Sequence, residues 1–457
     1  MSESAFDCVV IGSGPGGYVA AIRAAQLGMK TAVIEKDKVG GRCLNYACIP
    51  AKAVLRVADV LTEIREAGDF GIKVSEPEID YAGVSARRTK VITTLTGGVA
   101  GLLKKNKIEV ISGEASLIGS GQVKVGDQTI TAKTIVLAAG SIKRPIPGAE
   151  FGGRVIGTEE AWALDELPAS MAVVGAGASG AEIASAYARL GTEVILFEAL
   201  GRVLPTEDAD ISKLAERGLK RQGMTIHTGT LVEGIESGQD NVIFTYGDSG
   251  EGEVQWLVIA AGRGPDIAAL GLEAAGVKLG DNGLIAVDGA MRTSVEGVYA
   301  IGDLVPGPAL AHKASDEGVI AIEDAAGMST HPIEYVDVPR ATFCTPNVAS
   351  FGLTEAQARD AGHDVVVGKV QYGAVGAGTV YGDRTGLVKI VGEKRYGELL
   401  GGHIIGAKAT ELIQELVNAR ALEGGYPEVA HLVHGHPTLS EAVMEAARAA
   451  DGWLIHG

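Results

Sequence analysis

Two stretches of the chain share one pattern of apolar and glycine positions. The first, FDCVVIGSGPGGYVAAIRAAQLGMKTAVIEK, starts at Phe6, and the second, MAVVGAGASGAEIASAYARLGTEVILFEA, starts at Met171. In each, a short apolar run leads into G-x-G-x-x-G, then an alanine-rich run, a glycine and a second apolar run that ends in Glu. This order predicts a strand, a tight turn, a helix and a second, parallel strand. The chain is therefore expected to be an α/β protein with two such units.

The glycines of these turns have separate physical tasks. The first makes the turn, the second lets the backbone approach a pyrophosphate, and the third lets the helix pack on the strand. The helix N-terminus offers N–H groups to phosphates, and the closing Glu can accept hydrogen bonds from ribose hydroxyls. One such turn can arise by chance, but two complete copies indicate two bound dinucleotides, a flavin and a nicotinamide. The residues are Gly12, Gly14, Gly17 and Glu35 in the first copy, and Gly175, Gly177, Gly180 and Glu198 in the second.

The remaining segments carry weaker signals. TIVLAAGSIKRPIPG predicts a strand that ends in Gly140, and EGVYAIGDL predicts a strand that ends in Gly302 and Asp303. That aspartate can bond a sugar or ribitol hydroxyl, or it can cap the next helix, and the sequence favours neither. AHKASDEGVIAIEDAAG predicts an amphipathic helix. Past Asp337 the pattern predicts antiparallel strands, a crossing helix and two further helices, a separate α+β unit suited to a subunit interface.

The charge of the chain limits its partners. A net charge of −17 and a pI of about 5.1 argue against nucleic acid and against an anionic membrane surface. The longest uncharged stretches, Cys8–Ile22 and Leu167–Ala181, are rich in glycine and shorter than the ~20 apolar residues that span a bilayer. The N-terminal sequence has no signal-peptide pattern, so we expect a soluble cytoplasmic protein. In that compartment a disulfide is more often catalytic than structural.

Two of the four cysteines, Cys43 and Cys48, lie close together in GGRCLNYACIPAK. Such a pair can hold a metal or form a small disulfide ring, but the sequence around it supplies no further Cys or His ligand, which disfavours a metal. Pro50 suits a first helical turn, which would set Cys48 near a helix N-terminus where a thiolate is favoured. Cys8 and Cys344 sit in apolar strand contexts, so we expect them to be buried packing residues.

With these pieces in order, essentially the full chain resembles the flavin-dependent pyridine nucleotide–disulfide oxidoreductases. The resemblance rests on both glycine turns, on G-G-x-C-L-N-x-x-C-I-P-x-K, on the "GD" strand end and on HGHPTLSE near the C-terminus. It implies FAD and NAD as cofactors, no metal, and electron transfer from a dithiol to NAD⁺ through a disulfide and the flavin. As partners it implies a second copy of the chain in a homodimer, and lipoyl domains of a 2-oxoacid dehydrogenase complex or the lipoyl carrier of glycine cleavage.

The resemblance also assigns roles near the flavin. It implies that Cys43 and Cys48 form the redox-active disulfide, with Cys43 exchanging with the substrate and Cys48 facing the flavin as a thiolate. Lys52 matches a lysine near the flavin N5 edge, and Glu182 matches the acid that pairs with this lysine. Taken by themselves, Lys52 would be a solvated lysine and Glu182 an acid on a helix surface. An acid at Glu198 would repel a 2′-phosphate, which favours NAD over NADP.

The C-terminal motif supplies the matching base. His436 matches the catalytic base and Glu441 the acid that orients its imidazole; a histidine suits this task because a dithiol must lose a proton to attack. The resemblance further implies a cis peptide between His436 and Pro437, and an active site completed by the histidine of the partner subunit. Nothing in the sequence gives His434 more than a structural role.

The predicted fold class is α/β, with two Rossmann-like dinucleotide-binding domains, for FAD and NAD, and a C-terminal α+β dimerisation domain. We expect an FAD-binding domain with the disulfide over residues 1–147, an NAD-binding domain over 148–267, a central domain over 268–336 and the dimerisation domain over 337–457. Residues expected to bind the cofactors are Gly12, Gly14, Gly17, Glu35, Lys52, Gly140, Gly302, Asp303, Gly175, Gly177, Gly180, Glu198 and Arg263.

Some positions depart from the family pattern without removing a catalytic group. They are Arg42, Tyr46, Ala47, Ala51, Ala178, Ser179 and the stretch 371–382. These departures leave open the redox potential, the range of substrates and the strength of the interface. Two other functions compete with the one implied, a reductase of another small disulfide and a flavoprotein that binds without turnover; the HGHPTLSE motif and Glu198 disfavour the first, and the intact Cys–Cys, His–Glu and Lys–Glu sets disfavour the second. A mercuric-ion reductase is disfavoured because the chain ends in DGWLIHG, without a pair of cysteines.

Overall fold

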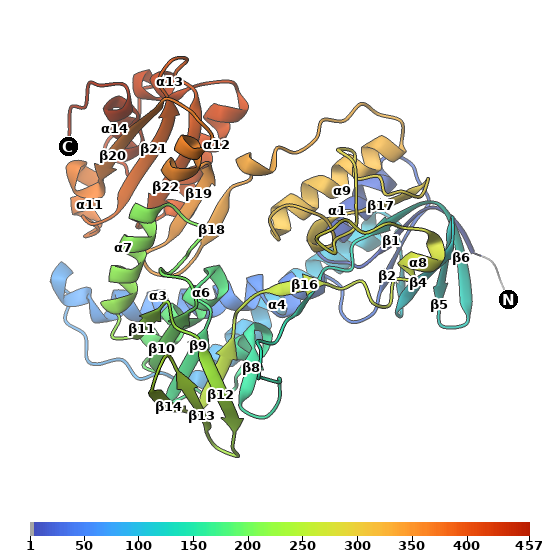
Figure 1. Ribbon diagram of the computed structural model, residues 1–457, viewed down its shortest axis with the longest axis horizontal. Helices are drawn as coiled ribbons and strands as arrows, with labels where there is room; N and C mark the ends of the chain where they lie inside the picture. Colours follow the sequence, from blue (N-terminus) through green and yellow to red (C-terminus); the bar gives the residue numbers. More distant parts are fainter. Residues whose placement is uncertain (1–3) are drawn as a thin grey trace. The chain divides into compact units, whose positions relative to one another are not determined.

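The computed structural model describes residues 4–457 and shows an α/β protein, as the sequence predicts (Figure 1). The chain forms two compact units. The first unit comprises Met1–Ala53, Ala82–Arg144 and Gly262–Tyr335, and the second comprises Val54–Tyr81, Pro145–Ala261 and Val336–Gly457. The finer division into four domains remains a prediction. Among the helices described, none is long and apolar enough to cross a membrane.

A seven-stranded sheet organises the first unit. Strands β3, β2, β1 and β6 run parallel in that order, β17 pairs with β6 in the same direction, and β5 and β4 continue antiparallel from β6. The bounds are β1 Ser4–Ile11, β2 Thr31–Glu35, β3 Glu109–Ser112, β4 Ala115–Gly119, β5 Gln122–Val125, β6 Gln128–Leu137 and β17 Val298–Ala300. A separate antiparallel pair joins β7 (Ser141–Lys143) to β16 (Arg263–Pro265).

Strand β1 is buried on both faces, as expected for a parallel strand between two covering layers. Val9 and Ile11 belong to one apolar cluster, and the alternate residues Cys8 and Val10 belong to another. Burial of the Cys8 thiol raises its pKa to about 12. Cys8 is therefore a packing residue, as predicted.

Helices α1 (Pro15–Gln26) and α9 (Ala311–Ala325) lie side by side in the first unit (Figure 1). Their approach requires glycine, because a Cβ on Gly16 would lie 2.8 Å from the carbonyl oxygen of Ala314, and one on Gly318 would lie 2.7 Å from that of Gly16. The predicted helix is confirmed as α9. However, its amphipathic pattern is misleading at Lys313 and Glu317, whose side chains are fully buried. The unit also contains α2 (Gly41–Asn45), α8 (Leu272–Ala275) and the 3₁₀ turn η2 (Gly302–Leu304), while α3 (Cys48–Arg65) and α4 (Tyr81–Lys105) have residues in both units.

The second unit contains a parallel sheet of its own, in the order β11-β10-β9-β15-β8. Its strands are β8 Val155–Gly157, β9 Ser170–Val174, β10 Glu193–Glu198, β11 Thr225–Thr228 and β15 Trp256–Ile259. Helix α6 connects β9 to β10, and an antiparallel sheet of three strands lies between β11 and β15 in the sequence. These elements are α5 Thr158–Ala163, α6 Ala178–Leu190, α7 Ala209–Lys220, β12 Val232–Ser237, β13 Val242–Tyr246 and β14 Gly250–Val254, with η1 Ala67–Phe70 preceding them.

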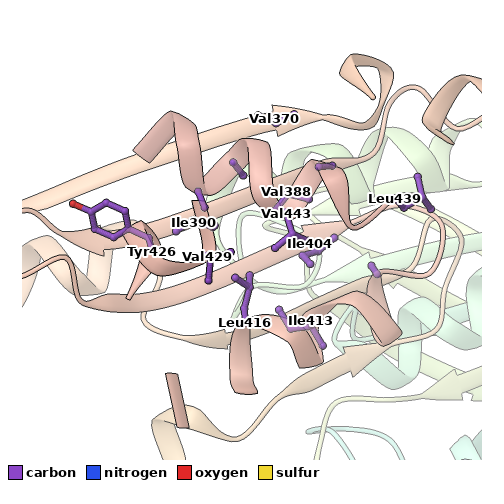
Figure 2. Packing of buried hydrophobic residues seen from close by; sticks show 14 of the residues in the cluster. Val370, Val388, Ile390, Ile404, Ile413, Leu416, Tyr426, Val429, Leu439 and Val443 are labelled. Atoms are coloured by element: carbon purple, nitrogen blue, oxygen red, sulfur yellow. The ribbon is translucent and has the colours of Figure 1, made fainter. Parts of the chain in front are cut away.

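The C-terminal part of this unit is an antiparallel sheet in the order β18-β19-β22-β21-β20. Figure 2 shows apolar side chains of the sheet, Val388 and Ile390 among them, packed against helices that include Leu416 and Val443. The bounds are β18 Arg340–Thr342, β19 Val348–Gly352, β20 Val365–Gln371, β21 Leu387–Glu393, β22 Leu399–Ile405, α10 Glu355–Asp360, α11 Gly376–Val380, α12 Ala409–Ala421, α13 Tyr426–His431 and α14 Glu441–Ala450, with η3 Tyr335–Asp337 and η4 Tyr372–Ala374.

Several boundaries differ from the sequence prediction. Strand β6 ends at Leu137 and β17 at Ala300, because the chain turns before reaching the glycines that were expected to close them. Cys344 is buried, as predicted, but it lies in the turn between β18 and β19 rather than in a strand. Three helices, not two, end the chain, since the Gly–Gly–Tyr–Pro stretch starts a short helix of its own at Tyr426.

One buried lysine joins two sheets of the second unit. Lys389 lies on β21, on the face opposite to Val388 and Ile390, and its side chain is 2% exposed. Its ammonium group lies 2.8 Å from Asp208, 2.9 Å from Asp210 and 2.8 Å from Glu355. Asp208 caps α7, which follows β10, so the contact ties the parallel sheet to the C-terminal sheet.

We expect Lys389→Met to destabilise the protein by about 3–5 kcal/mol, because it leaves the buried carboxylate of Asp208 without its cation. Lys369→Met is the matched control. Lys369 also pairs with Asp210, at 2.7 Å, but its side chain is 44% exposed, so its loss should cost at most about 1 kcal/mol. Chemical denaturation followed by tryptophan fluorescence measures both. Equal losses for the two variants would contradict the special role of Lys389.

The stability lost in Lys389→Met should also depend on pH. Burial raises the pKa of Asp210 and the bonds from Lys369 and Lys389 lower it; the bonds prevail and bring the pKa to about 2 from 3.8. A lowered carboxylate pKa stabilises the fold above pH 3.8, and this contribution is lost as the pH falls toward about 2. The stability difference between wild type and Lys389→Met should therefore shrink across that range. A constant difference would contradict the assignment.

Candidate active site and nucleotide sites

The first glycine turn joins β1 to α1. At two of its glycines a side chain would collide with the backbone, and at the third, the open position, it would meet no protein atom. Gly12 has φ +102°, and a Cβ there would overlap the carbonyl oxygen of Ala138. A Cβ on Gly17 would overlap the carbonyl oxygen of Gly12. At Gly14, in contrast, a Cβ would meet no protein atom within 4 Å. The turn therefore packs tightly on its strand yet leaves its middle glycine approachable by a ligand.

Glu35, the last residue of β2, lies beside this turn. Its Oε2 accepts hydrogen bonds from the backbone N–H of Ser13 at 2.9 Å and from the Ser13 hydroxyl at 2.5 Å. Its Oε1 accepts one from the N–H of Asp37 at 2.9 Å. A carboxylate has about four acceptor positions, so the fixed side chain retains capacity for a ribose hydroxyl.

The second turn, between β9 and α6, repeats this geometry. Gly175 has φ +105°, and a Cβ on it would lie 2.7 Å from the carbonyl oxygen of Ala260. A Cβ on Gly180 would overlap the carbonyl oxygen of Gly175, whereas one on Gly177 would meet nothing within 4 Å.

Glu198 ends β10 as Glu35 ends β2. It accepts hydrogen bonds from the N–H groups of Ala176 at 2.7 Å and Leu200 at 2.9 Å. Helices α1 and α6 begin directly after Gly14 and Gly177, so their N-terminal N–H groups and positive dipole ends lie at the open positions. Both turns thus have the shape and the donors that a dinucleotide requires, which fits FAD at one and NAD at the other.

Cys43 and Cys48 form a disulfide with Cα atoms 4.8 Å apart. Cys43 lies in α2, and Cys48 is the first residue of α3 with Pro50 in its first turn, as predicted. A helix N-terminus stabilises a thiolate at Cys48 when the disulfide opens. The segment is tied to the first glycine turn, because the N–H of Gly40 donates to the Ser13 hydroxyl at 3.1 Å. Within residues 4–457 no group of three or more His, Cys, Asp or Glu side chains is arranged to hold a metal ion.

The strand end at Gly302–Asp303 belongs to a polar network. The Ser141 hydroxyl donates to the carboxylate of Asp303 at 2.5 Å. Arg263 donates to the same hydroxyl at 2.9 Å and to the Ser141 carbonyl at 2.5 Å. Helix α9 has Leu310 as its N-cap, so Asp303 does not cap it and the alternative role fails. Sequence reasoning missed Ser141, although it directly follows Gly140.

The His–Glu pair forms as predicted. His436 Nδ1 lies 2.9 Å from Glu441 Oε1, and the other carboxylate oxygen accepts from the N–H of Thr438 at 2.9 Å. Burial raises the pKa of Glu441, but the bonds from Thr438 and His436 outweigh this and lower it, which keeps the carboxylate charged. The His436 side chain is 75% exposed, and its peptide bond to Pro437 is cis, as the resemblance implied.

The other predicted catalytic residues lie on well-defined helices. Lys52 is in the first turns of α3, and Glu182 is buried on α6, where it accepts a hydrogen bond from the N–H of Phe343 at 2.9 Å. They belong to different units, so their pairing remains a prediction, as does the meeting of His436 with the disulfide.

A second histidine pair was missed. His434 Nε2 lies 2.5 Å from Glu415 on α12, and Nδ1 lies 3.0 Å from the carbonyl oxygen of Leu432. The bond to Glu415 raises the pKa of His434. The pair fixes residues 432–436, the C-terminal strap, which carries His436. No short-range pattern could reveal the pair, because its partners are 19 residues apart.

Three of the departures from the family pattern, Tyr46, Ala178 and Ser179, lie beside these sites. The Tyr46 hydroxyl donates to Asp37 at 2.6 Å, and the ammonium of Lys38 lies 5.1 Å from the centre of the Tyr46 ring. Ala178 and Ser179 are exposed in the first turn of α6, beside the open glycine of the second turn. None of them disrupts the hydrogen bonds of either turn.

Comparison with known families agrees with this geometry. Residues 6–318 match the model of the pyridine nucleotide-disulphide oxidoreductases, and residues 338–447 match the dimerisation domain of the same family. The chain belongs to this family. It is thus an FAD-dependent oxidoreductase that acts on sulfur groups and uses NAD, with a C-terminal dimerisation domain that supports a homodimer.

Individual relatives are similar over almost their whole length. The dihydrolipoyl dehydrogenase of Rhizobium etli is 42% identical, with all of both chains covered, and one from Bacillus subtilis is 41% identical over 98% of this chain and 97% of the relative. Among solved structures, LpdA from Mycobacterium tuberculosis has a TM-score of 0.90 at 27% identity, covering 97% of this chain and 99% of that one. RclA from Escherichia coli, an HOCl-induced flavoprotein disulfide reductase, has a TM-score of 0.86 at 26% identity, covering 98% and 99%.

We expect Gly14→Ala and Gly177→Ala to leave the fold intact but weaken dinucleotide binding, because the added methyl would meet no protein atom within 4 Å and would enter the space expected for a dinucleotide. Gly14→Ala should weaken FAD and Gly177→Ala should weaken NAD, each at least about tenfold, or about 1.4 kcal/mol. Flavin titration of the apoprotein and NAD titration of the holoprotein measure this. The control is Gly98→Ala on α4, also without neighbours, which should change neither affinity. Unchanged dinucleotide affinity in the first two variants would contradict the assignment of the turns.

Proposed function

We propose that the protein is a dihydrolipoyl dehydrogenase, which oxidises protein-bound dihydrolipoamide and reduces NAD⁺ through the Cys43–Cys48 disulfide and FAD. The observation that carries this proposal is the tie between the disulfide segment and the first nucleotide turn, made by Gly40 and Ser13. A disulfide fixed to a dinucleotide turn can exchange electrons with a flavin there. The relatives that share about 40% identity over their full length are named for the same reaction.

The residues of this chain can carry out the exchange between the substrate dithiol and the disulfide. His436, held through Nδ1 by Glu441, takes a proton at Nε2 from one thiol of the substrate. That thiolate attacks Cys43 Sγ, the bond to Cys48 breaks, and Cys48 leaves as a thiolate stabilised by the start of α3. The second substrate thiol then attacks the substrate sulfur of the mixed disulfide, and the bond from that sulfur to Cys43 breaks. Oxidised lipoamide forms, the proton of the second thiol passes to the Cys43 sulfur, and His436 keeps the first proton.

When bound, FAD would supply the two-electron chemistry that links the reduced cysteine pair to NAD⁺. Around it, Gly12, Gly14 and Gly17 would receive the pyrophosphate and Glu35 the adenosine ribose, while Gly140, Gly302, Asp303 and Arg263 would line the ribitol side. Lys52, paired with Glu182, would lie at the reacting edge of the ring. Gly175, Gly177, Gly180 and Glu198 would hold NAD.

The same proposal assigns segments, partners and location. Residues 1–147 would bind FAD, 148–267 NAD, 268–336 would complete the flavin site, and 337–457 would form the dimer. The substrate would be presented by lipoyl domains of a 2-oxoacid dehydrogenase complex or by the lipoyl carrier of glycine cleavage. A cytoplasmic location fits a disulfide that opens and closes during turnover.

We expect purified protein to oxidise dihydrolipoamide with NAD⁺, and kcat/KM with NAD⁺ to exceed that with NADP⁺ roughly tenfold to a hundredfold, about 1.4–3 kcal/mol. The reason is Glu198, which would bond the ribose and repel a 2′-phosphate. Steady-state assays with both coenzymes, and with lipoamide and glutathione disulfide as acceptors, measure it. Equal use of both coenzymes would refute the role of Glu198. Preferential reduction of glutathione disulfide would favour a reductase of another disulfide.

We expect each active site to be built from two subunits, with His436 serving the disulfide of the partner. Inactive Cys48→Ser and His436→Gln chains, refolded together, pair at random, and about half of the dimers are mixed. Each mixed dimer then holds one site with both intact groups, so activity should return to about a quarter of wild type. If each site forms within one chain, activity stays near zero although mixed dimers are demonstrated.

A further inference from the structure

Both backbone polar groups of Gly302 are held by side chains of helix α9. Its N–H donates to Glu317 Oε2 at 2.8 Å, and its carbonyl oxygen accepts from Lys313 Nζ at 2.9 Å. The two side chains are one helical turn apart and pair with each other at 3.1 Å, and both are fully buried. The N–H and the C=O of one glycine thus contact an ion pair whose two side chains are fully buried.

Tyr335 completes this arrangement, which we call the buried triad (Lys313, Glu317 and Tyr335). The Tyr335 hydroxyl donates to Glu317 Oε1 at 2.6 Å, and its ring centre lies 5.3 Å from Lys313 Nζ. Burial raises the pKa of Tyr335, and the bond to Glu317 raises it further, so the hydroxyl keeps its proton. Gly307 makes room for the triad, since a Cβ there would lie 3.0 Å from the Tyr335 ring.

Stability alone is a poor reason for such a triad. Burying a lysine and a glutamate removes both from water, and apolar residues of similar volume often give equal or greater stability. What the charges add is direction, because the two bonds fix the N–H and the C=O on either side of the Gly302 Cα. Gly302 has φ +73°, in the left-handed region, and the direction of its peptide determines where the next side chain points.

The next side chain is that of Asp303, whose carboxylate accepts from the Ser141 hydroxyl at 2.5 Å. The triad contacts the backbone of Gly302, and the Ser141 hydroxyl contacts the side chain of Asp303. We propose that the buried triad consists of positioning residues for the flavin. They set the Gly302–Asp303 turn, and through Asp303 they set how tightly the protein retains FAD. The inference rests on the role in flavin binding proposed above for Asp303.

Release of FAD from the purified holoenzyme tests this. The rise of flavin fluorescence after dilution gives the release rate, at a temperature where far-UV circular dichroism shows every variant folded. Glu317→Gln removes the charge that pairs with Lys313 and should speed release at least about tenfold. Tyr335→Phe keeps the ring and removes only the hydroxyl that holds Glu317, so it should speed release by a smaller factor, about threefold or more.

The matched control is Glu323→Gln, on the same helix. Glu323 pairs with Arg23 of α1 at 2.5 Å. The variant therefore loses an ion pair between α9 and α1 and leaves the contacts of the Gly302–Asp303 turn unchanged. Its release rate should stay within about twofold of wild type. Equal acceleration in Glu323→Gln and Glu317→Gln would overturn the inference, because any weakening of α9 would then suffice. If Glu317→Gln does not fold, Tyr335→Phe against the same control decides the matter.

Asp303→Ala separates this inference from the role on which it rests. If Asp303→Ala speeds release and the triad variants do not, the triad is only structural and the inference fails alone. If Asp303→Ala leaves release unchanged, the flavin role of Asp303 fails and the inference fails with it. Faster release in Asp303→Ala, Glu317→Gln and Tyr335→Phe, but not in Glu323→Gln, supports it. Dihydrolipoamide turnover plays no part in these measurements.

Discussion

Where a parallel strand gives way to its helix, the backbone passes so close to itself that no side chain fits. At Gly17 and Gly180 a single carbon would overlap the carbonyl oxygen of the first glycine of the same turn. This closeness draws the helix N-terminus onto the end of the strand, and the carboxylate of the neighbouring strand bonds the N–H groups of the turn. The N–H donors proposed for phosphate and the carboxylate proposed for ribose therefore arise from one steric constraint, which occurs twice in the chain.

Buried charge is the second recurring device. The side chains of Lys389 and Lys313 are both buried, and each contacts a carboxylate. The partner of Lys389 is Asp208, which is distant in the sequence, and the partner of Lys313 is Glu317, one helical turn away. Each lysine serves a junction rather than a surface, one between two sheets and one between a helix and a strand end. Apolar packing fills the neighbouring positions, as on the opposite face of β21 (Figure 2). Packing thus supplies the bulk of the contacts while the buried ions specify how elements meet.

Local patterns explain what could be predicted from the sequence. The glycine turns and the start of α3 at Cys48 depend on residues near one another in the chain, so spacing predicts them. The His436–Glu441 pair was implied by the family resemblance of the HGHPTLSE motif. Ser141 and Asp303 are 162 positions apart, and Lys389 and Asp208 are 181 apart. No periodicity links such partners. For the same reason the amphipathic pattern of α9 predicts Lys313 and Glu317 on a solvated face, although both side chains are buried. Only the folded chain brings them together.

The exposure of the C-terminal strap has a consequence for the cell. Leu432 is 56% and Val433 98% exposed in the isolated chain, a few residues before His436. In the dimer proposed above, the same pairing that brings the base to a disulfide also brings this apolar strap to a partner. An unpaired chain would therefore lack turnover and would display a segment that chaperones and proteases recognise. The amount of working enzyme would then follow the assembly of chains rather than their rate of synthesis.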